Sequence, residues 1–106
     1  MKRFALRAIR LASSLPSHPA GQVLGKQLLR SATSVDANYR AACRGRSRAE
    51  FAAKLGIVIE EADESCYWPE LIMESDLLKP DLVKPLWDEA NEIVAIMVSS
   101  RKTAMS

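Results

Sequence analysis

The sequence contains few of the residues that build metal sites and disulfide frameworks. Among 106 residues there is one histidine, His18, and there are two cysteines, Cys43 and Cys66. A ferritin-like di-metal site requires Glu-x-x-His pairs that project inward from helices, and His18 belongs to no such pair. The two cysteines lack the C-x-x-C spacing of zinc and redox sites. We therefore expect neither a metal nor a cofactor.

The motifs of common enzyme classes are also missing. There is no glycine-rich phosphate loop and no G-x-S-x-G sequence. The only histidine lies in a predicted loop, so no helix offers a histidine as a general base. A pair formed by Cys43 or Cys66 with His18 is conceivable, but nothing in the sequence supports it. We expect a protein without enzymatic activity and without a small-molecule substrate.

No apolar run approaches the roughly 18 residues that a membrane span needs. The N-terminal residues MKRFALRAIRLASSLPS have a basic start, but Arg7 and Arg10 interrupt the apolar part. An amphipathic helix therefore fits this stretch better than a signal peptide. Without a secretory signal, Cys43 and Cys66 are expected to be reduced and to serve as small apolar core residues. The expected location is the cytoplasm.

The residues that are present favour helices. Aromatic residues make up only 6% of the chain, whereas hydrophobic residues make up 48%, with Ala and Leu prominent among them. Apolar residues recur every three or four positions, as in amphipathic helices. This pattern predicts four helices in a single domain (residues 1–106), at about residues 2–15, 19–44, 47–76 and 81–102. Short connections predict an all-α, antiparallel up-down-up-down four-helix bundle.

Two signals define the connection between the second and third predicted helices. Arg44 and Gly45 supply a cation and a C′ glycine, which together typically end a helix. Ser47 and Glu50 match the capping box S-x-x-E directly before an apolar run. The third helix is therefore expected to begin at this serine.

Three residues disturb the helical pattern. Gly21 and Gly25 each weaken a helix by about 1 kcal/mol relative to alanine. Their position in the first turns of the second helix indicates fraying or a neighbour that approaches closely. Pro69 removes one backbone hydrogen bond inside the third helix. Because the apolar pattern resumes after it, we expect a kink there and not a termination.

Charge is distributed unevenly along the chain. Residues 1–54 contain eleven Lys/Arg and two Asp/Glu, whereas residues 55–106 contain four Lys/Arg and eleven Asp/Glu. Such a division is typical of a basic binding face. It is equally consistent with an acidic half that neutralises the basic half, either within the fold or between subunits. Both interpretations stay open at this point.

Basic residues of the first half form a candidate nucleic-acid-binding set, because Lys and Arg neutralise phosphates independently of base sequence. The set comprises Arg3, Arg7, Arg10, Lys26, Arg30, Arg40, Arg44, Arg46, Arg48 and Lys54. No aromatic residues interleave with it, so stacking on single-stranded bases is not expected. No recognition-helix motif indicates sequence specificity. The alternative is that these side chains are solvated or form salt bridges with Glu60, Glu61, Asp63 and Glu64.

A second candidate set could form contacts between subunits. Ser31, Ser34 and Asn38 share one stripe of the second helix and are small or thin enough for a neighbouring helix to come near. Tyr67, Trp68 and Trp87 could line a ligand pocket, but packing at the end of the bundle or at a subunit contact fits them better.

Three stretches resemble one known family. They are QLLRSATSVDANYRAA (27–42), SRAEFAAKLGIVIEEADESCYW (47–68) and ANEIVAIMVSSRKTA (90–104). In this order they are similar to the small four helix bundle proteins, which include the 23S rRNA intervening sequence protein and Avd, the accessory protein of diversity-generating retroelements. The resemblance covers nearly the whole chain. Two residues depart from it, Pro69 in place of a leucine-like residue and Asp36 in place of a small one.

The resemblance implies a ring-shaped homopentamer with a central channel. For Avd-like members it also implies association with RNA or DNA, or service to a reverse transcriptase. We therefore expect a non-enzymatic oligomeric bundle with a basic face for nucleic acid or for a nucleic-acid-handling partner. The alternative is a structural or adaptor oligomer that binds another protein and has no nucleic-acid role.

Overall fold

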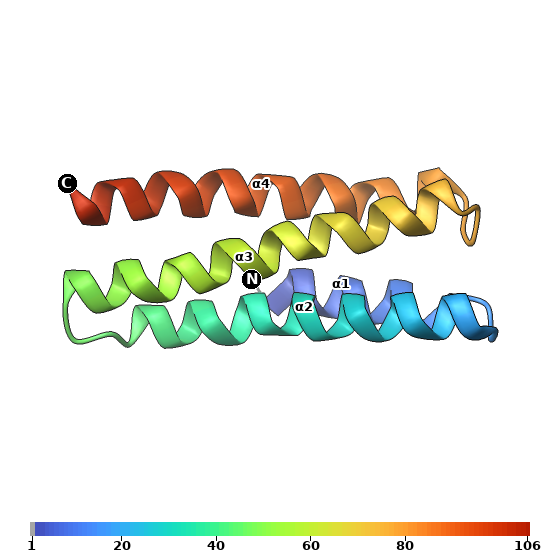
Figure 1. Ribbon diagram of the computed structural model, residues 1–106, viewed down its shortest axis with the longest axis horizontal. Coiled ribbons are helices and arrows are strands. Elements are labelled where there is room, and N and C mark those ends of the chain that lie inside the picture. The colour runs from blue at the N-terminus through green and yellow to red at the C-terminus, as the bar shows by residue number, and fades with distance from the viewer. Residues whose placement is uncertain (1) are drawn as a thin grey trace.

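The computed structural model describes residues 2–106 and consists of four helices. They are α1 (Lys2–Ser13), α2 (Pro19–Cys43), α3 (Arg48–Glu74) and α4 (Pro80–Met105). Neighbouring helices run in opposite directions along one axis of a bundle that measures 45 × 19 × 18 Å (Figure 1). α3 packs against both α2 and α4, and α1 packs against α2 and, less extensively, against α4. The predicted all-α four-helix bundle is confirmed.

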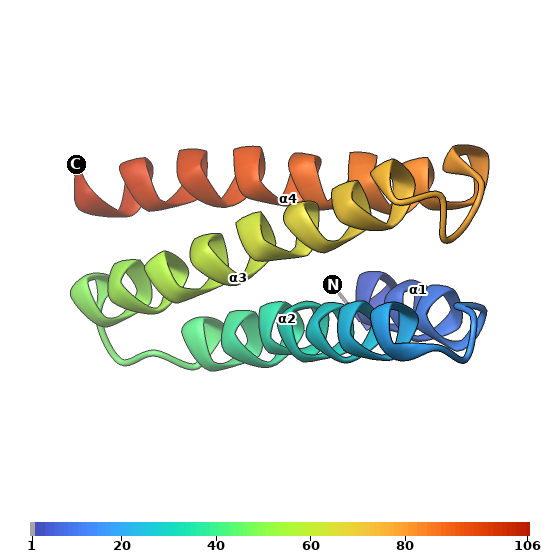
Figure 2. The ribbon, with the colours of Figure 1, turned by 45° about the vertical axis from the view of Figure 1, so that its right-hand side comes forward.

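The first helix is much shorter than the others. α1 has 12 residues and α2 has 25, which correspond to about 18 Å and about 37 Å of helix. α1 therefore covers only the half of the bundle that adjoins the α1–α2 turn, and the other half contains three helices (Figures 1 and 2). α1 also ends two residues earlier than predicted. The backbone N–H of Ser14 donates to the Leu11 carbonyl at 3.0 Å, and that of Leu15 donates to the Ala12 carbonyl at 3.3 Å, so the last turn has hydrogen bonds that span three residues.

The core follows the predicted apolar stripes, with one correction. Its largest fully buried apolar side chains come from all four helices and are Phe4, Leu28, Val35, Leu55, Val58, Ile72, Val83 and Pro69. The apolar spacing predicts Leu82 as the first core residue of α4, but Leu82 is 60% exposed and Val83 is buried in its place. Val83 begins the regular seam that continues through Leu86 and Ala90. In α2 the spacing allows either Val23 or Leu24 in the stripe, and Leu24 is the half-buried one.

The beginning of α3 confirms half of the predicted capping box. The Ser47 hydroxyl accepts the backbone N–H of Glu50 at 3.1 Å. The Glu50 carboxylate accepts the backbone N–H of Arg46 at 3.2 Å, one residue before the position that a capping box would use. The helix therefore begins as predicted, and the glutamate ties down the preceding turn.

α2 ends where the sequence predicts, with Arg44 as its C-cap and Gly45 directly after it. The backbone N–H groups of Arg44 and Gly45 bond the carbonyls of Ala41 and Ala42 at 3.2 and 3.0 Å. No glycine among residues 2–106 has a positive φ, so Gly45 is not a left-handed C′ residue. The helix ends by tightening its last turn. A Cβ at Gly45 would lie 3.1 Å from the Ala42 oxygen, which makes this tight turn favour glycine.

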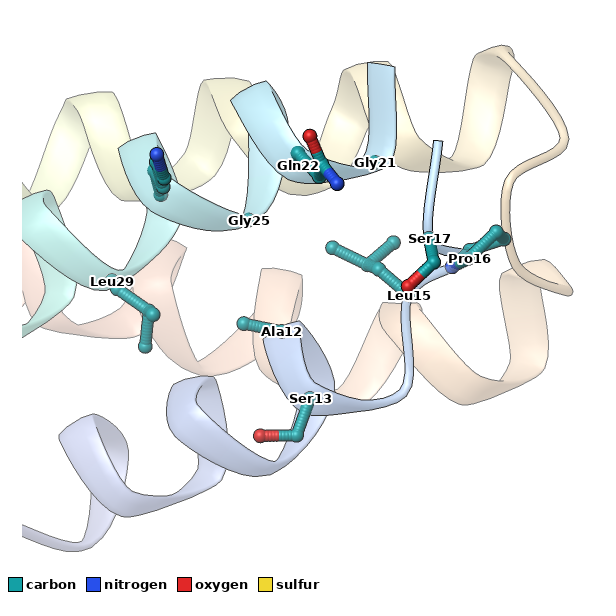
Figure 3. A pocket seen from close by; sticks show the side chains of 10 residues that line it. Ala12, Ser13, Leu15, Pro16, Ser17, Gly21, Gln22, Gly25 and Leu29 are labelled. Carbon is teal, nitrogen blue, oxygen red and sulfur yellow. The ribbon is translucent and has the colours of Figure 1, made fainter. Parts of the chain in front are cut away.

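All three residues that disturb the helical pattern lie inside helices. α3 continues through the buried Pro69 to Glu74, so the predicted continuation is confirmed, whereas the kink stays a prediction. Gly21 and Gly25 are buried in the first turns of α2, where the α1–α2 turn lies directly against them (Figure 3). A Cβ on Gly21 would overlap the Pro16 carbonyl oxygen. These glycines mark close packing and not fraying.

Candidate functional site

Three helix ends and one turn meet at the end of the bundle where α1 is absent. The end of α2, the α2–α3 turn, the beginning of α3 and the end of α4 lie side by side there (Figure 1). We call their basic residues the basic end: Arg40, Arg44, Arg46, Arg48, Lys54, Arg101 and Lys102. In residues 40–54 and 93–106 the only acidic side chain is Glu50. The geometry therefore concentrates positive charge at one end.

The charges of the basic end are free of carboxylate partners. No ion pair described for residues 2–106 involves any of its seven members. Glu50 lies in the first turn of α3, where it complements the helix dipole and accepts the Arg46 N–H. Only Lys54 and Arg101 are partly buried, and the other five side chains are exposed. The positive potential of this end is thus directed at the solvent.

The two α4 members of the basic end, Arg101 and Lys102, are absent from the set predicted from sequence. Arg101 reaches across to α3, where its Nε donates to the Ala52 carbonyl at 3.1 Å. The guanidinium lies over Gly56, so that a Cβ there would be 3.4 Å from Cζ. The signal that could have found these residues is topological. In an up-down-up-down bundle, the end of the fourth helix lies beside the turn between the second and third.

Two open grooves flank the contact between α3 and α4 at this end. One has a volume of about 490 Å³ and is lined by Arg48, Phe51, Ser99, Ser100, Thr103 and Ala104. The other has a volume of about 470 Å³ and is lined by Arg48, Ala49, Ala52, Ala53, Arg101, Ala104 and Met105. Arg48 borders both grooves, so the first residue of α3 connects them.

The remaining basic residues of the predicted set lie elsewhere. Arg3, Arg7 and Arg10 are on α1, which covers the opposite half of the bundle (Figure 1). Lys26 is about 27 Å along α2 from Arg44. The predicted extension of the basic patch onto α1 is therefore wrong for a single subunit, because α1 is too short to reach the α2–α3 turn.

Two of the predicted phosphate-binding arginines are neutralised within the fold. Arg7 pairs with Glu89 of α4 at 2.8 Å. Arg30 pairs with Glu61 at 3.3 Å and with Glu64 of α3. For these two residues the alternative interpretation, salt bridges to the acidic half, is correct. Such half-exposed pairs contribute little stability, but they lower the positive charge that a ligand would meet.

The small polar stripe of α2 serves the core of the subunit. Ser31 and Ser65 are fully buried, and their hydroxyl oxygens lie 3.0 Å apart between α2 and α3. The carbonyls of Leu28 and Glu61 complete this network at 3.2 and 2.8 Å. Ser31 is therefore unavailable as the predicted subunit contact, because its side chain is consumed by packing on α3.

The other members of the stripe keep some exposure. Ser34 and Asn38 are half-buried, and the Asn38 amide donates to the Ser34 carbonyl at 2.9 Å. This bond satisfies the amide within its own helix. A role for the two residues between subunits stays a prediction.

The aromatic residues of α3 and α4 do not line a common pocket among the cavities found. Tyr67 is half exposed and meets Trp68 edge to face, with ring centroids 4.9 Å apart. The indole N–H of Trp87 donates to Glu70 at 2.9 Å. The Trp68 indole nitrogen is buried, without a hydrogen-bond partner among the described residues. Trp68 and Trp87 pack against the core, so Tyr67 offers the largest free aromatic surface.

The two cysteines have different environments. Cys66 is buried as predicted, and burial, with the charges of Asp63 and Glu70, raises the pKa of its thiol to about 11. Cys43 is exposed at the end of α2, so the prediction of a core position is wrong for it. Its side chain raises the pKa of Tyr39, one turn earlier, through a hydrogen bond and through its charge.

A separate cavity lies at the opposite end, in the α1–α2 turn. It has a volume of about 320 Å³ and is lined by the residues drawn in Figure 3, including Ser13, Ser17, Gln22 and Lys26. Within residues 2–106 there is no cluster of three or more potential metal ligands. In the same part of the chain, no helix is long and apolar enough to cross a membrane.

Comparisons with known proteins place this geometry in a family. Residues 1–99 match the family model described as 23S rRNA-intervening sequence protein. The fold is similar to the crystal structure, at 1.70 Å resolution, of a protein of unknown function from the S23 ribosomal protein family of Bacteroides thetaiotaomicron. The TM-score is 0.88 at 35% sequence identity, over 95% of this chain and 94% of the other. Among curated proteins, none matches the chain.

Proposed function

We propose that this chain, which belongs to the 23S rRNA-intervening sequence protein family, binds the phosphate backbone of a nucleic acid with its basic end and has no enzymatic activity. The observation that carries the proposal is the gathering of seven basic side chains, none in an ion pair, at one end of the bundle. Arginine and lysine supply the sequence-independent part of nucleic-acid affinity through phosphates.

The chemistry of the basic end favours backbone contacts over base contacts. The five-residue stretch 44–48 at the α2–α3 turn contains three arginines, Arg44, Arg46 and Arg48. The positive end of the α3 dipole adds to their electrostatic field. The aromatic residues of this end, Tyr39 and Phe51, are half-buried and pack against the core. Stacking on splayed bases would require exposed rings. A duplex or a structured RNA is therefore the favoured ligand.

The proposal includes assembly into a ring, as the family resemblance implies. A ring requires two different surfaces that complement one another on successive subunits. α1 exposes Leu6 and Ile9 beside Arg3 and Arg10, whereas α3 exposes Ile57 and Tyr67 among acidic residues. A pentamer built this way would present five copies of the basic end, and multivalency would strengthen weak phosphate contacts. In the other form of this proposal the basic end binds a nucleic-acid-handling protein, such as the reverse transcriptase that Avd serves.

The proposal is tested by charge reversal at the basic end. The triple variant Arg44→Glu, Arg46→Glu, Arg48→Glu is compared with a matched triple, Lys26→Glu, Lys79→Glu, Lys84→Glu, whose three exposed lysines lie outside the basic end and which changes net charge equally. The second triple lies about 25 to 33 Å along the helices from the basic end, which is about three Debye lengths at 0.15 M salt, so its effect there is largely screened. Binding to labelled duplex DNA and structured RNA, and mass by light scattering, are measured for each.

We expect the first triple to abolish binding and to leave the oligomer intact, and the second to retain binding at that salt. For the wild type, affinity should fall by orders of magnitude between about 50 and 200 mM salt. An oligomer that dissociates in the first triple would favour the adaptor alternative, in which the basic half of one subunit meets the acidic half of the next. Absence of binding even at low salt would overturn the proposal.

A further inference from the structure

We propose that Arg101 is a pre-oriented phosphate-binding side chain, and that the groove between the first turn of α3 and the last turns of α4 holds one backbone phosphate between Arg101 and Arg48. The inference rests on the proposed nucleic-acid function and specifies where the closest contact is made. It adds an α4 residue that neither the charge pattern of the first half nor the family match assigns.

Arg101 differs from the other basic residues in being held in one position. Its Nε–H bonds the Ala52 carbonyl at 3.1 Å, and its guanidinium plane lies against Gly56, where the missing side chain leaves room for it. A guanidinium has five N–H donors, and this bond uses one. The four donors on the two terminal nitrogens have no hydrogen-bond partner within residues 2–106. They form the fork that binds a phosphate through two parallel bonds.

The groove allows a phosphate to come close to this fork. Four of its seven lining residues are alanines, Ala49, Ala52, Ala53 and Ala104, and Met105, the one long apolar side chain there, is 66% exposed. Arg48 borders the same groove and has no hydrogen bond or ion pair through its side chain within the described chain. No carboxylate lines the groove. The site is thus a shallow, uncompensated cationic cleft with one rigid arginine and one free arginine.

Pre-orientation gives Arg101 an advantage over its neighbour. A flexible exposed side chain loses rotamer freedom when it binds, and this loss weakens its net contribution to affinity. Arg101 is already ordered by its contacts with α3, so this loss is small. Lys102 carries the same charge one residue later but is exposed and is in no ion pair within residues 2–106. A comparison of Arg101 with Lys102 therefore distinguishes a positioned cation from a flexible one.

The test compares Arg101→Lys and Arg101→Ala with Lys102→Ala and Lys102→Arg, in duplex-binding titrations over a range of salt. We expect Arg101→Ala to weaken binding about tenfold or more and to lower the log–log salt slope by about one. Arg101→Lys should lose most of the same affinity although it keeps the charge, because lysine has neither the Nε bond nor the fork. Lys102→Ala should weaken binding less than Arg101→Ala does, and Lys102→Arg should weaken it less than Arg101→Lys does.

A second measurement distinguishes phosphate binding by Arg101 from a purely structural role of that side chain. Arg48→Ala removes no bond of the fold, so its thermal unfolding should be unchanged while its affinity falls. If both arginines hold one phosphate, the Arg48→Ala, Arg101→Ala double variant should lose less affinity than the two single losses combined. Additive losses, or Arg101→Lys binding like wild type, would overturn the inference. In that case a wild type that still binds leaves the proposed function standing, whereas a wild type that binds no nucleic acid refutes both.

Discussion

Replacing Gly21 by alanine should destabilise the protein, although alanine is the better helix former. Gly21 is buried in the first turn of α2, and an added Cβ would overlap the Pro16 carbonyl oxygen. That oxygen is a backbone atom and also accepts the His18 N–H at 3.0 Å. The α1–α2 turn must therefore shift, and α1 must shift with it, or the first turn of α2 must deform.

The magnitude follows from opposing contributions. Overpacking of this kind costs about 1–3 kcal/mol, and weakening the bond from the His18 N–H costs about 0.5–1.5 kcal/mol. The helix propensity of alanine returns up to about 1 kcal/mol. The free energy of unfolding should thus fall by about 0.5–3.5 kcal/mol, and each kcal/mol lowers Tm by roughly 4 °C in a chain of this size.

Gly25 provides the matched control one turn later. A Cβ there would lie 3.3 Å from the Leu15 Cδ1 methyl, which can rotate away. Gly25→Ala should therefore leave the free energy of unfolding within about 0.5 kcal/mol of wild type, because propensity offsets the crowding. Urea unfolding followed by circular dichroism, at one fixed protein concentration, measures both variants. The reasoning is refuted if Gly21→Ala is as stable as Gly25→Ala.

Three further predictions concern the buried polar groups and the thiols. A thiol reagent at pH 8 should modify Cys43 quickly and Cys66 only after unfolding, and Cys43→Ser should abolish the fast phase. Because the pKa of Cys66 is raised to about 11, its thiol ionises first in the unfolded chain, so its contribution to stability is complete below about pH 8.5 and declines as the pH rises toward 11. Cys66→Ala should be less sensitive than wild type to pH over this window in denaturant titrations. Ser31→Ala and Ser65→Ala should each cost about 1 kcal/mol, and the double variant should cost less than the sum, because both remove one hydrogen bond; additive costs would contradict this.

The helices were predictable because their apolar stripes have the period of a helix. Ambiguity remains where a shift of one residue leaves the pattern almost unchanged. Leu82 and Val83 both continue a stripe of α4, and the choice between them depends on the rotation of the helix against α3. In α2 the pattern leaves Val23 and Leu24 as alternatives, and the structure selects Leu24. The end of α2 was predictable because Arg44 and Gly45 are typical of a helix end, although the turn closes with three-residue hydrogen bonds and without a positive φ.

The candidate site was only partly predictable, for a related reason. Sequence shows which charges lie on one helix, but not which carboxylates a neighbouring helix brings to them. Arg30 and Arg44 look alike in sequence, yet Arg30 pairs with Glu61 and Glu64 of α3, whereas Arg44 is in no ion pair within residues 2–106. Arg101 was overlooked because it belongs to the acidic half of the chain. Only the antiparallel arrangement of the helices places it at the basic end.

The short α1 has a consequence for how firmly the two ends of the subunit are held. Near the α1–α2 turn, four helices shield the backbone, with Phe4, Ala8 and Leu11 of α1 closing the core. Toward the other end only three helices remain (Figure 2). Protection of backbone amides against exchange with solvent should therefore decrease along the long axis of an isolated subunit. The end that carries the arginines is then the end that opens first, and a polyanion bound there would slow amide exchange where the subunit alone protects it least.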